Sequence, residues 1–275
     1  MRIDLNADVG EGFDDVPLLK YLTSVNIACG AHAGSPDIMR SMVLHCKQHK
    51  MAIGAHPGYE DPDNFGRVNL HLPHEALLSS IQQQVQLLAD ILKSESLPLD
   101  HVKPHGALYN QGCVDSRIAD CIVEAVLATK LRPCIMCPDP SELASAARRK
   151  GLTVIAEAFA DRAYLKNGFI APRSYAGSCI ENPLEAADQA LRIARRQGVR
   201  YLEIVAHKNG DKEIRREGFD HVGVDSEREI IIEASSICVH GDSNAALKTA
   251  MLVAESLKSE GIQIQSYLKS IRYVC

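Results

Sequence analysis

Short apolar runs alternate with longer amphipathic segments along almost the whole chain, and this alternation constrains the fold more than any other feature. Seven runs have the character of strands, namely 2–8, 24–30, 51–56, 101–105, 133–138, 152–160 and 236–241. Most of them are separated by segments with apolar side chains at a spacing of three and four, which is typical of helices. Strands that alternate with helices predict a parallel sheet, either open and doubly wound or closed into a barrel.

Polar side chains follow nearly every predicted strand at its carboxyl end. In chain order they are Asn6, Asp8, Glu11, Cys29, His32, His56, Arg67, Lys103, His105, Glu157, Asp161, Arg162, His240 and Asp242. A doubly wound sheet builds its site at one switch point, whereas a barrel collects its site from the loops after many strands. The distribution therefore favours an α/β fold of the (β/α)-barrel type, TIM-like with about seven strands.

The length of 275 residues and the hydrophobic content of 46% suit a single barrel domain over residues 1–275. One segment interrupts the alternation, because residues 199–235 hold two β-rich runs around a charged stretch from Lys208 to Arg216. We expect a hairpin with a solvated tip, inserted before the last strand of the barrel.

The net charge and the cysteines of the chain indicate which partners and which redox environment suit it. A net charge of -5 gives no support for nucleic acid or an anionic membrane as a partner. No apolar run approaches the roughly 20 residues of a membrane span, and "MRIDLNADVGEG" has the character of a strand rather than of a secretory leader. Nine scattered cysteines, an odd number, suit reduced thiols. We expect a cytoplasmic protein.

The stretch "VKPHGALYN", residues 102–110, places a lysine and a histidine where a buried strand ends. The proline after Lys103 cannot donate to a strand ladder and favours an extended backbone before it, so the strand should stop here. Side chains alternate along an extended chain, and Lys103 and His105 should therefore both face the barrel mouth. A buried ammonium needs an anion, which we expect to be Asp8, Glu157 or the substrate.

Six motifs in order along the chain resemble those of the LamB/YcsF family. They are "DLNADVGEG", "NIACGAHAGSPDIM", "IGAHPGYEDPDNFGR", "VKPHGALYN", "AEAFADRAY" with "APRS", and "ICVHGD". The resemblance runs from residue 2 to about residue 264, and six long motifs in order are highly specific. It implies a (β/α) barrel of the glycoside hydrolase/deacetylase-like group, in agreement with the count of strands.

The resemblance also implies an activity. It indicates one component of an ATP-dependent 5-oxoprolinase, a hydrolase of a cyclic amide that opens 5-oxo-L-proline to L-glutamate together with partner subunits B and C. The sequence has no G-x-x-x-x-G-K-[ST] loop, so we expect ATP and Mg to bind at the partner subunits and no cofactor to bind this chain. The sequence is also compatible with a homo-oligomer.

Three features depart from the family pattern. Ala31 stands where members usually carry Phe, which removes a bulky wall beside His32 and bears on the shape of the pocket and hence on the substrate. Ser35 stands where they usually carry Asp, but with Pro36 at the first helical position it can still cap its helix. The insertion at 208–230 also looks longer than usual.

Opening a phosphorylated lactam needs a base for water, donors for the developing oxyanion, an acid for the leaving nitrogen and a charge for the substrate carboxylate. The catalytic candidates are Asp8, His32, His56, Lys103, His105, Glu157, Asp161 and Asp242. The substrate-binding candidates are Asn6, Glu11, Arg67, Tyr109, Asn110, Arg162 and His240. We expect Lys103 to be the partner of the anion that forms or binds in the site, and Asp8 and His32 to activate water.

Two other functions stay open. A metal-dependent amidohydrolase or deacetylase could use Asp8, His32 and His56 as its two imidazoles and one carboxylate. These residues lie on three different strands without a local H-x-x-x-H pair, so no metal ligand is assigned from the sequence. The second alternative is a non-catalytic subunit that holds the lactam for its partners.

Some residues have a purely structural interpretation. We expect surface or half-buried positions on helices or loops for His45, His49, His71, His74 and His101. Asp161 and Arg162 could form an internal salt bridge at the barrel mouth.

Overall fold

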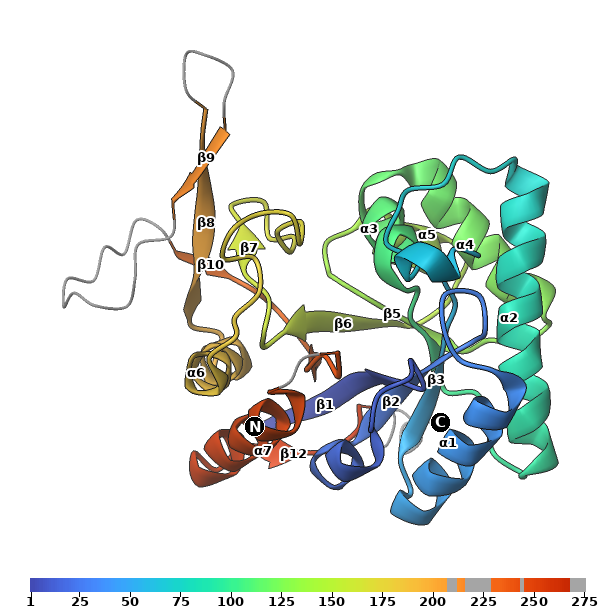
Figure 1. Ribbon diagram of the computed structural model, residues 1–275, viewed down its shortest axis with the longest axis horizontal. Coiled ribbons are helices and arrows are strands. Elements are labelled where there is room, and N and C mark those ends of the chain that lie inside the picture. Colours follow the sequence, from blue (N-terminus) through green and yellow to red (C-terminus); the bar gives the residue numbers. More distant parts are fainter. Residues whose placement is uncertain (207–211, 216–228, 243–244, 268–275) are drawn as a thin grey trace.

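The computed structural model describes residues 1–206, 212–215, 229–242 and 245–267 (Figure 1). Seven parallel strands form its barrel: β1 (Arg2–Val9), β2 (Ser24–Ala28), β3 (Ala52–His56), β4 (His101–Val102), β5 (Cys134–Cys137), β6 (Val154–Phe159) and β11 (Ser236–Cys238). Neighbouring strands pair in this order, and β11 closes the barrel by pairing with β1. A short strand, β12 (Gln263–Ile264), adds to the start of β1. The predicted seven-stranded TIM-like barrel is confirmed.

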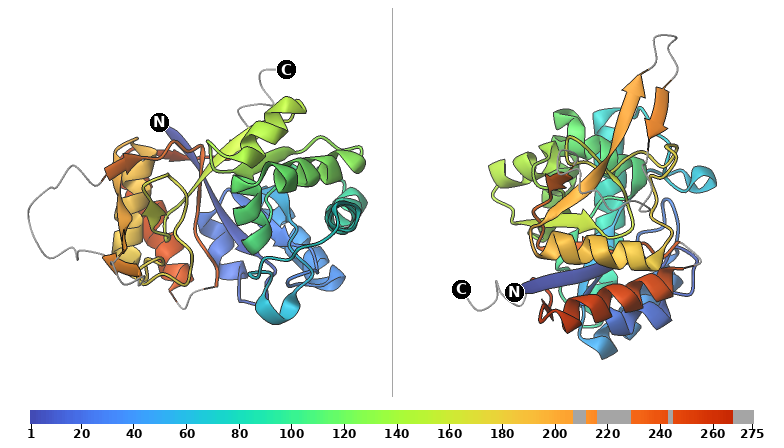
Figure 2. Two further views of the ribbon diagram at one scale, coloured as in Figure 1. Left: turned by 90° about the horizontal axis from the view of Figure 1, so that it is seen from above. Right: turned by 90° about the vertical axis from the view of Figure 1, so that its left-hand side faces the viewer.

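Helices surround the strands. They are α1 (Pro36–His49), α2 (His74–Ser94), α3 (Gly106–Val114), α4 (Ser116–Ala128), α5 (Glu142–Arg149), α6 (Pro183–Ala194) and α7 (Ala246–Ser259), with 3-10 turns η1 (Val16–Tyr21) and η2 (Pro62–Asn64). Ser35 caps α1 as expected, because its hydroxyl accepts a hydrogen bond from the backbone N–H of Ile38 at 3.3 Å. Seen from above, α2 to α5 lie on the side of the barrel opposite to α6 (Figure 2).

The fourth strand is shorter than predicted, since β4 ends at Val102. The chain nevertheless stays alongside β3: the N–H of Lys103 donates to the carbonyl of Ala55, and that of His105 donates to Pro57. The proline between them has no N–H and breaks the regular ladder. Lys103 and His105 thus leave the strand at its carboxyl end, next to the end of β3.

Between β6 and β11 the chain builds a second, smaller sheet. Its long strand β8 (Gly198–Ala206) pairs antiparallel with β9 (Lys212–Arg215) and β10 (Glu229–Ile231), and parallel with β7 (Tyr164–Leu165). Figure 1 shows this sheet beside the barrel, next to α6. The two β-rich runs of the expected hairpin correspond to β8 and β10. The expected solvated tip, and with it most of the 208–230 insertion, lies outside the described residues except for β9.

Burial in β1 follows the alternation of its side chains. Ile3, Leu5, Ala7 and Val9 belong to the main hydrophobic core, whereas the alternate positions carry the buried polar side chains of Asp4, Asn6 and Asp8. An acidic or amide side chain in a buried strand needs partners inside the barrel. No helix within the described ranges is long and apolar enough to cross a membrane, and the eight cysteines that they contain are free.

Candidate active site

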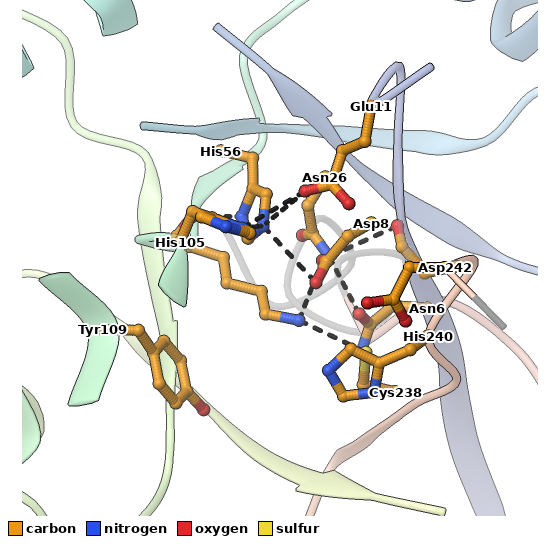
Figure 3. Close-up of polar contacts among 12 residues, drawn as sticks. Asn6, Asp8, Glu11, Asn26, His56, His105, Tyr109, Cys238, His240 and Asp242 are labelled. Carbon is orange, nitrogen blue, oxygen red and sulfur yellow. Dashed lines mark hydrogen bonds and ion pairs between the residues drawn. The ribbon is translucent and has the colours of Figure 1, made fainter. Parts of the chain in front are cut away.

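A buried polar network fills the barrel interior below its mouth (Figure 3). The amide of Asn26 on β2 donates to Asn6 Oδ1 at 2.9 Å and to Asp8 Oδ1 at 2.8 Å. Asn6 in turn donates to the hydroxyl of Ser236 at 2.8 Å, and Ser236 donates to Asp4. Because each member is held by the next, the network fixes the orientation of the Asp8 carboxylate. Asn6, a predicted substrate-binding residue, therefore lies in the floor of the site.

His101 also belongs to this floor, and the expectation of a surface or half-buried position was wrong. Its side chain is fully buried on β4, with Nε2 at 2.7 Å from Asn26 Oδ1. Burial, with a contribution from the charge of Lys103, lowers the pKa of His101 to about 3, so the neutral ring donates to the amide oxygen. His101 stands two residues before Lys103 in an extended segment, and this spacing indicates a shared inward direction.

Lys103 lies between two carboxylates. Its Nζ is 2.9 Å from Asp8 Oδ1 and 2.8 Å from Glu157 Oε1, and its third close partner is Cys238 Sγ at 3.3 Å. The expectation of an acid beside the ammonium is confirmed. These three partners occupy the three protons of the ammonium group. A substrate anion could reach Lys103 only by displacing the thiol, which is the weakest of the three acceptors.

The charges of this group determine its protonation. Burial alone would raise the pKa of Asp8, but the charges of His56 and Lys103 outweigh burial and hold the pKa well below its ordinary value. Burial alone would lower the pKa of Lys103, whereas the charge of Asp8 and also that of Glu157 raise it well above its ordinary value. Asp8 is therefore a carboxylate and Lys103 an ammonium at neutral pH.

Three imidazoles and a carboxylate meet beside Asp8, and Figure 3 shows two of the imidazoles, His56 and His105, with Glu11. Glu11 Oε1 lies 3.1 Å from His32 Nε2, 3.2 Å from His105 Nδ1 and 3.7 Å from His56 Nε2. His56 Nε2 is also 3.4 Å from Asp8 Oδ2. The imidazole next to Asp8 is thus His56, whereas His32, the expected partner for water activation, contacts Glu11. We define Glu11, His32, His56 and His105 as the imidazole cluster.

The loop after η2 packs over the imidazole cluster. The carbonyl of Phe65 accepts a hydrogen bond from His105 Nε2 at 2.8 Å, and the Phe65 ring makes edge contacts with His32 and His105. Gly66 follows with φ of +62°, and a Cβ atom there would lie 2.8 Å from the Cβ of His32. Only glycine fits this approach. The motif "GYEDPDNFGR" therefore contributes Phe65 and Gly66 to the site in addition to Arg67.

Two arginines meet an acid at the rim of the barrel mouth. Asp242 pairs with Arg67 and, at 3.1 Å, with Arg173 Nη2, and the guanidinium of Arg67 lies over the Phe65 ring at 4.7 Å. Arg173 comes from the motif "APRS" and was not among the predicted site residues. Both arginine side chains are about one third exposed, at 37% and 34%. They are the cations through which the rim could bind a small anion.

Asp161 and Arg162 do not form the expected salt bridge among the described ion pairs. Asp161 accepts hydrogen bonds from the backbone N–H of His240 at 2.7 Å and from His240 Nδ1 at 2.8 Å. Arg162 instead donates to the backbone carbonyls of Ser178 and Ala171. Arg162 therefore braces the loop that carries Arg173, while His240 turns toward the site with its ring stacked on Phe159.

The remaining candidates lie on α3, beside β6. Tyr109 Oη donates to Glu157 Oε2 at 2.7 Å, which joins Tyr109 to Lys103 through Glu157. The next residue, Asn110, is exposed and makes none of the described contacts that join the other candidates. Glu157 also lines a cavity of about 520 Å³ between the barrel and the small sheet. A small molecule could therefore reach the Glu157 side of the site.

Comparison with known proteins places this geometry in a family. A family model described as the LamB/YcsF family matches residues 3–208 and 216–272. The chain belongs to the LamB/YcsF family. It is 38% identical, over 97% of its length and 100% of the relative, to a Thermus thermophilus protein named as the A subunit of 5-oxoprolinase. A Bacillus subtilis protein with the same name is 35% identical, with 96% of each chain covered.

A solved structure shares the whole fold of this LamB/YcsF family member. The crystal structure of a lactam utilization protein from Thermus thermophilus superposes with a TM-score of 0.82 at 35% identity, and the match covers 97% of this chain and 100% of that one. The similarity extends over nearly the whole length of the chain and includes the strands of the barrel.

Proposed function

We propose that this chain is the A subunit of an ATP-dependent 5-oxoprolinase, which opens 5-oxo-L-proline to L-glutamate together with partner subunits B and C in the cytoplasm. The names of the full-length relatives support this substrate class. The observation that carries a catalytic role is the buried ion triad of Asp8, Lys103 and Glu157, with His56 beside Asp8. A subunit that only holds a lactam would have no need for a buried carboxylate kept ionised next to an imidazole.

The reaction requires activation because a lactam is a stable amide. Transfer of a phosphoryl group from ATP to the lactam oxygen makes carbon 5 electrophilic. Water then adds to carbon 5, the bond from carbon 5 to the ring nitrogen breaks, and the nitrogen takes a proton. The resulting acyl phosphate releases phosphate and glutamate with a second water. The hydrolytic subunit has to supply a base for water and an acid for the nitrogen.

Asp8 is the base that activates water in this proposal, and His56 lies beside it. Asp8 stays ionised because of Lys103 and His56, and its second oxygen, Oδ2, faces His56 Nε2 at 3.4 Å. His32 contacts Glu11 rather than Asp8, so we assign the activation of water to Asp8, with His56 instead of His32 as the imidazole beside it. Lys103 acts through Asp8 by keeping this carboxylate ionised and in place.

His240 suits delivery of a proton to the leaving nitrogen. Asp161 binds His240 Nδ1 at 2.8 Å, which leaves Nε2 available on the side of the ring away from the carboxylate. A carboxylate behind an imidazole orients the ring and stabilises its protonated form. The carboxylate of 5-oxoproline would bind at the rim, where Arg67 and Arg173 already hold one carboxylate, that of Asp242.

Reconstitution tests the proposed function. The chain is mixed with candidate B and C subunits, ATP, Mg and 5-oxoproline, and glutamate is measured against time. Glutamate should form only when all three subunits are present, and Asp8→Asn should abolish it while the subunits still co-purify. If Asp8→Asn forms glutamate at the normal rate in an assembled complex, the chain has a non-catalytic binding role and the proposed mechanism is rejected.

A further inference from the structure

Two ring nitrogens in the imidazole cluster face each other, and when both rings are neutral neither nitrogen carries a hydrogen atom. His56 Nε2 and His105 Nδ1 lie 3.0 Å apart. The other nitrogen of each ring contacts a backbone carbonyl, that of Lys103 at 2.7 Å for His56 and that of Phe65 at 2.8 Å for His105. A carbonyl oxygen only accepts, so each neutral ring uses its one N–H there. Two lone pairs then point at each other, and this arrangement needs a cation between them.

We propose that this cation is a divalent transition-metal ion bound by Glu11, His56 and His105. Ligand atoms about 2.1 Å from a tetrahedral ion lie about 3.4 Å from one another. The three distances here scatter around that value: 3.0 Å between the two histidine nitrogens, 3.2 Å from Glu11 Oε1 to His105 Nδ1, and 3.7 Å from Glu11 Oε1 to His56 Nε2. Two imidazoles and one carboxylate are also a ligand set of zinc enzymes.

The backbone contacts of both rings fit the role of metal ligands. A histidine that binds a metal almost always donates its second N–H to a carbonyl or carboxylate, which fixes its tautomer and its orientation. His56 and His105 both do so, through the carbonyls of Lys103 and Phe65. The loop that covers the cluster and the segment that follows β4 therefore orient the two rings toward the same point.

With the three imidazoles neutral, the charge of the site also favours a cation of more than one positive charge. The carboxylates of Asp8, Glu11 and Glu157 carry three formal negative charges, and only the ammonium of Lys103 lies between two of them. Three carboxylates and one ammonium leave two formal negative charges, and the three carboxylate side chains are at most 8% exposed. Unbalanced buried charge is costly, and a divalent ion beside Glu11 and Asp8 would balance it, whereas one proton would not.

His32 supports the cluster without binding the ion. Its ring stacks on His105 with centroids 3.7 Å apart and planes at 2°. Two parallel rings at this distance cannot both direct their lone pairs at one ion about 2.1 Å away. His32 Nε2 instead lies 3.1 Å from Glu11 Oε1 and holds this carboxylate next to the other two ligands. The fourth position of the ion stays open beside Asp8, as in catalytic sites.

Metal binding by the isolated chain tests the proposal without using the 5-oxoprolinase assay, so its outcome is independent of the proposed function. Full-length protein without a histidine tag is freed of metal with a chelator and titrated with ZnCl₂ by calorimetry. We expect one ion per chain. His56→Ala and His105→Ala should each weaken binding by at least about 100-fold, because loss of a ligand exceeds the roughly 10–100-fold cost of a second-shell change.

Three further variants control for fold and for specificity. His240→Ala removes an imidazole outside the cluster and should leave zinc affinity unchanged. His32→Phe keeps a stacked ring and should also retain the ion. Glu11→Gln removes the charge of a loop residue but keeps its size and its hydrogen-bonding oxygen, so the fold should persist while binding weakens. Loss of zinc in His32→Phe, or normal binding in Glu11→Gln, would overturn the assignment of ligands.

A spectroscopic measurement on the unmodified protein tests the metal site without depending on whether the variants fold. Co²⁺ added to the metal-free chain should give intense visible absorption bands, typical of four or five ligands around the ion, and ZnCl₂ should abolish them in a one-to-one ratio. If the unmodified chain takes up neither Zn²⁺ nor Co²⁺ stoichiometrically, a proton fills the gap between His56 and His105 and the metal site does not exist.

Discussion

Lys103 Nζ lies 2.9 Å from Asp8 Oδ1 across the interior of the barrel, although 95 positions separate the two residues in the chain. Glu157 approaches the same ammonium from β6 at 2.8 Å. All three side chains are buried, so each charge depends on the others for compensation. Lys103 therefore contributes to the stability of the fold as well as to the chemistry of the site.

We predict that Lys103→Met destabilises the fold by about 3–5 kcal/mol, because it leaves two buried carboxylates without their cation. Urea denaturation followed by circular dichroism measures the effect. Lys47→Met serves as the control, since Lys47 pairs with Glu95 at the surface and its removal should cost no more than about 1 kcal/mol. A Lys103→Met protein as stable as the unmodified one would show that the carboxylates are not both ionised.

The sequence predicts the barrel because each strand is coded locally. Buried parallel strands are near-continuous apolar runs, and the residue types that follow them reveal which end holds the site. The seven strands and the presence of an acid next to Lys103 could be predicted in this way. The fourth strand was predicted to end three residues too late, because residues 103–105 stay alongside β3 while Pro104 interrupts the regular ladder.

Partners across the barrel could not be predicted, because they depend on the stagger between strands. Nothing in the sequence near Asp8 indicates that His56 rather than His32 faces it, or that Asn26 joins Asp8 to His101. The small sheet was also only partly foreseen. Its strand β7 has two residues, which is too short for a detectable pattern.

Gly54 should tolerate no side chain. It lies under the ring of His101, and a Cβ atom there would be 2.2 Å from Nε2 and 2.7 Å from Cε1. The ring cannot move away without breaking its hydrogen bond to Asn26. We predict that Gly54→Ala destabilises the protein by about 1–3 kcal/mol or more in thermal or urea unfolding. The double variant Gly54→Ala/His101→Ala should recover part of this loss, and failure to do so would contradict the contact as its cause.

Asp15 should make stability depend on pH. Burial, together with the charge of Glu11, raises its pKa to about 6 despite a hydrogen bond from the N–H of Gly10. A carboxyl with a raised pKa in the folded state binds its proton more tightly there than in the unfolded chain. Its favourable contribution is therefore complete below about pH 4 and is lost as the pH rises through about 6.

Asp15→Asn tests this linkage because asparagine resembles the protonated acid and can still accept from Gly10. Relative to the unmodified protein, the variant should gain about 1.4 kcal/mol between pH 5 and pH 8 in the free energy of unfolding. The exposed neighbour Asp14 provides the control: Asp14→Asn should show no such difference. Parallel pH curves for Asp15→Asn and the unmodified chain would refute the buried carboxyl as the source.

The isolated chain should not bind ATP. Its sequence has no phosphate-binding loop of the G-x-x-x-x-G-K-[ST] type, and the proposed division of labour assigns ATP to the partner subunits. Calorimetry with MgATP should give no saturable heat for the isolated chain, and the reconstituted three-subunit complex provides the positive control. Stoichiometric binding by the isolated chain would contradict this division.

Arg67 should bind the carboxylate of the substrate. It lies at the rim with its guanidinium over Phe65, and Asp242 keeps a second cation, Arg173, when Arg67 is removed. Loss of a charge-assisted hydrogen bond costs about 1.5–3 kcal/mol, so Arg67→Gln in the reconstituted complex should raise the KM for 5-oxoproline roughly 10- to 100-fold. Because the bond is made equally in the bound substrate and in the transition state, kcat should change little.

Arg117→Gln, which removes an exposed arginine paired with Asp115 outside the site, should leave both constants unchanged. An Arg67→Gln complex with unchanged KM but lower kcat would move Arg67 from substrate binding to the chemical step.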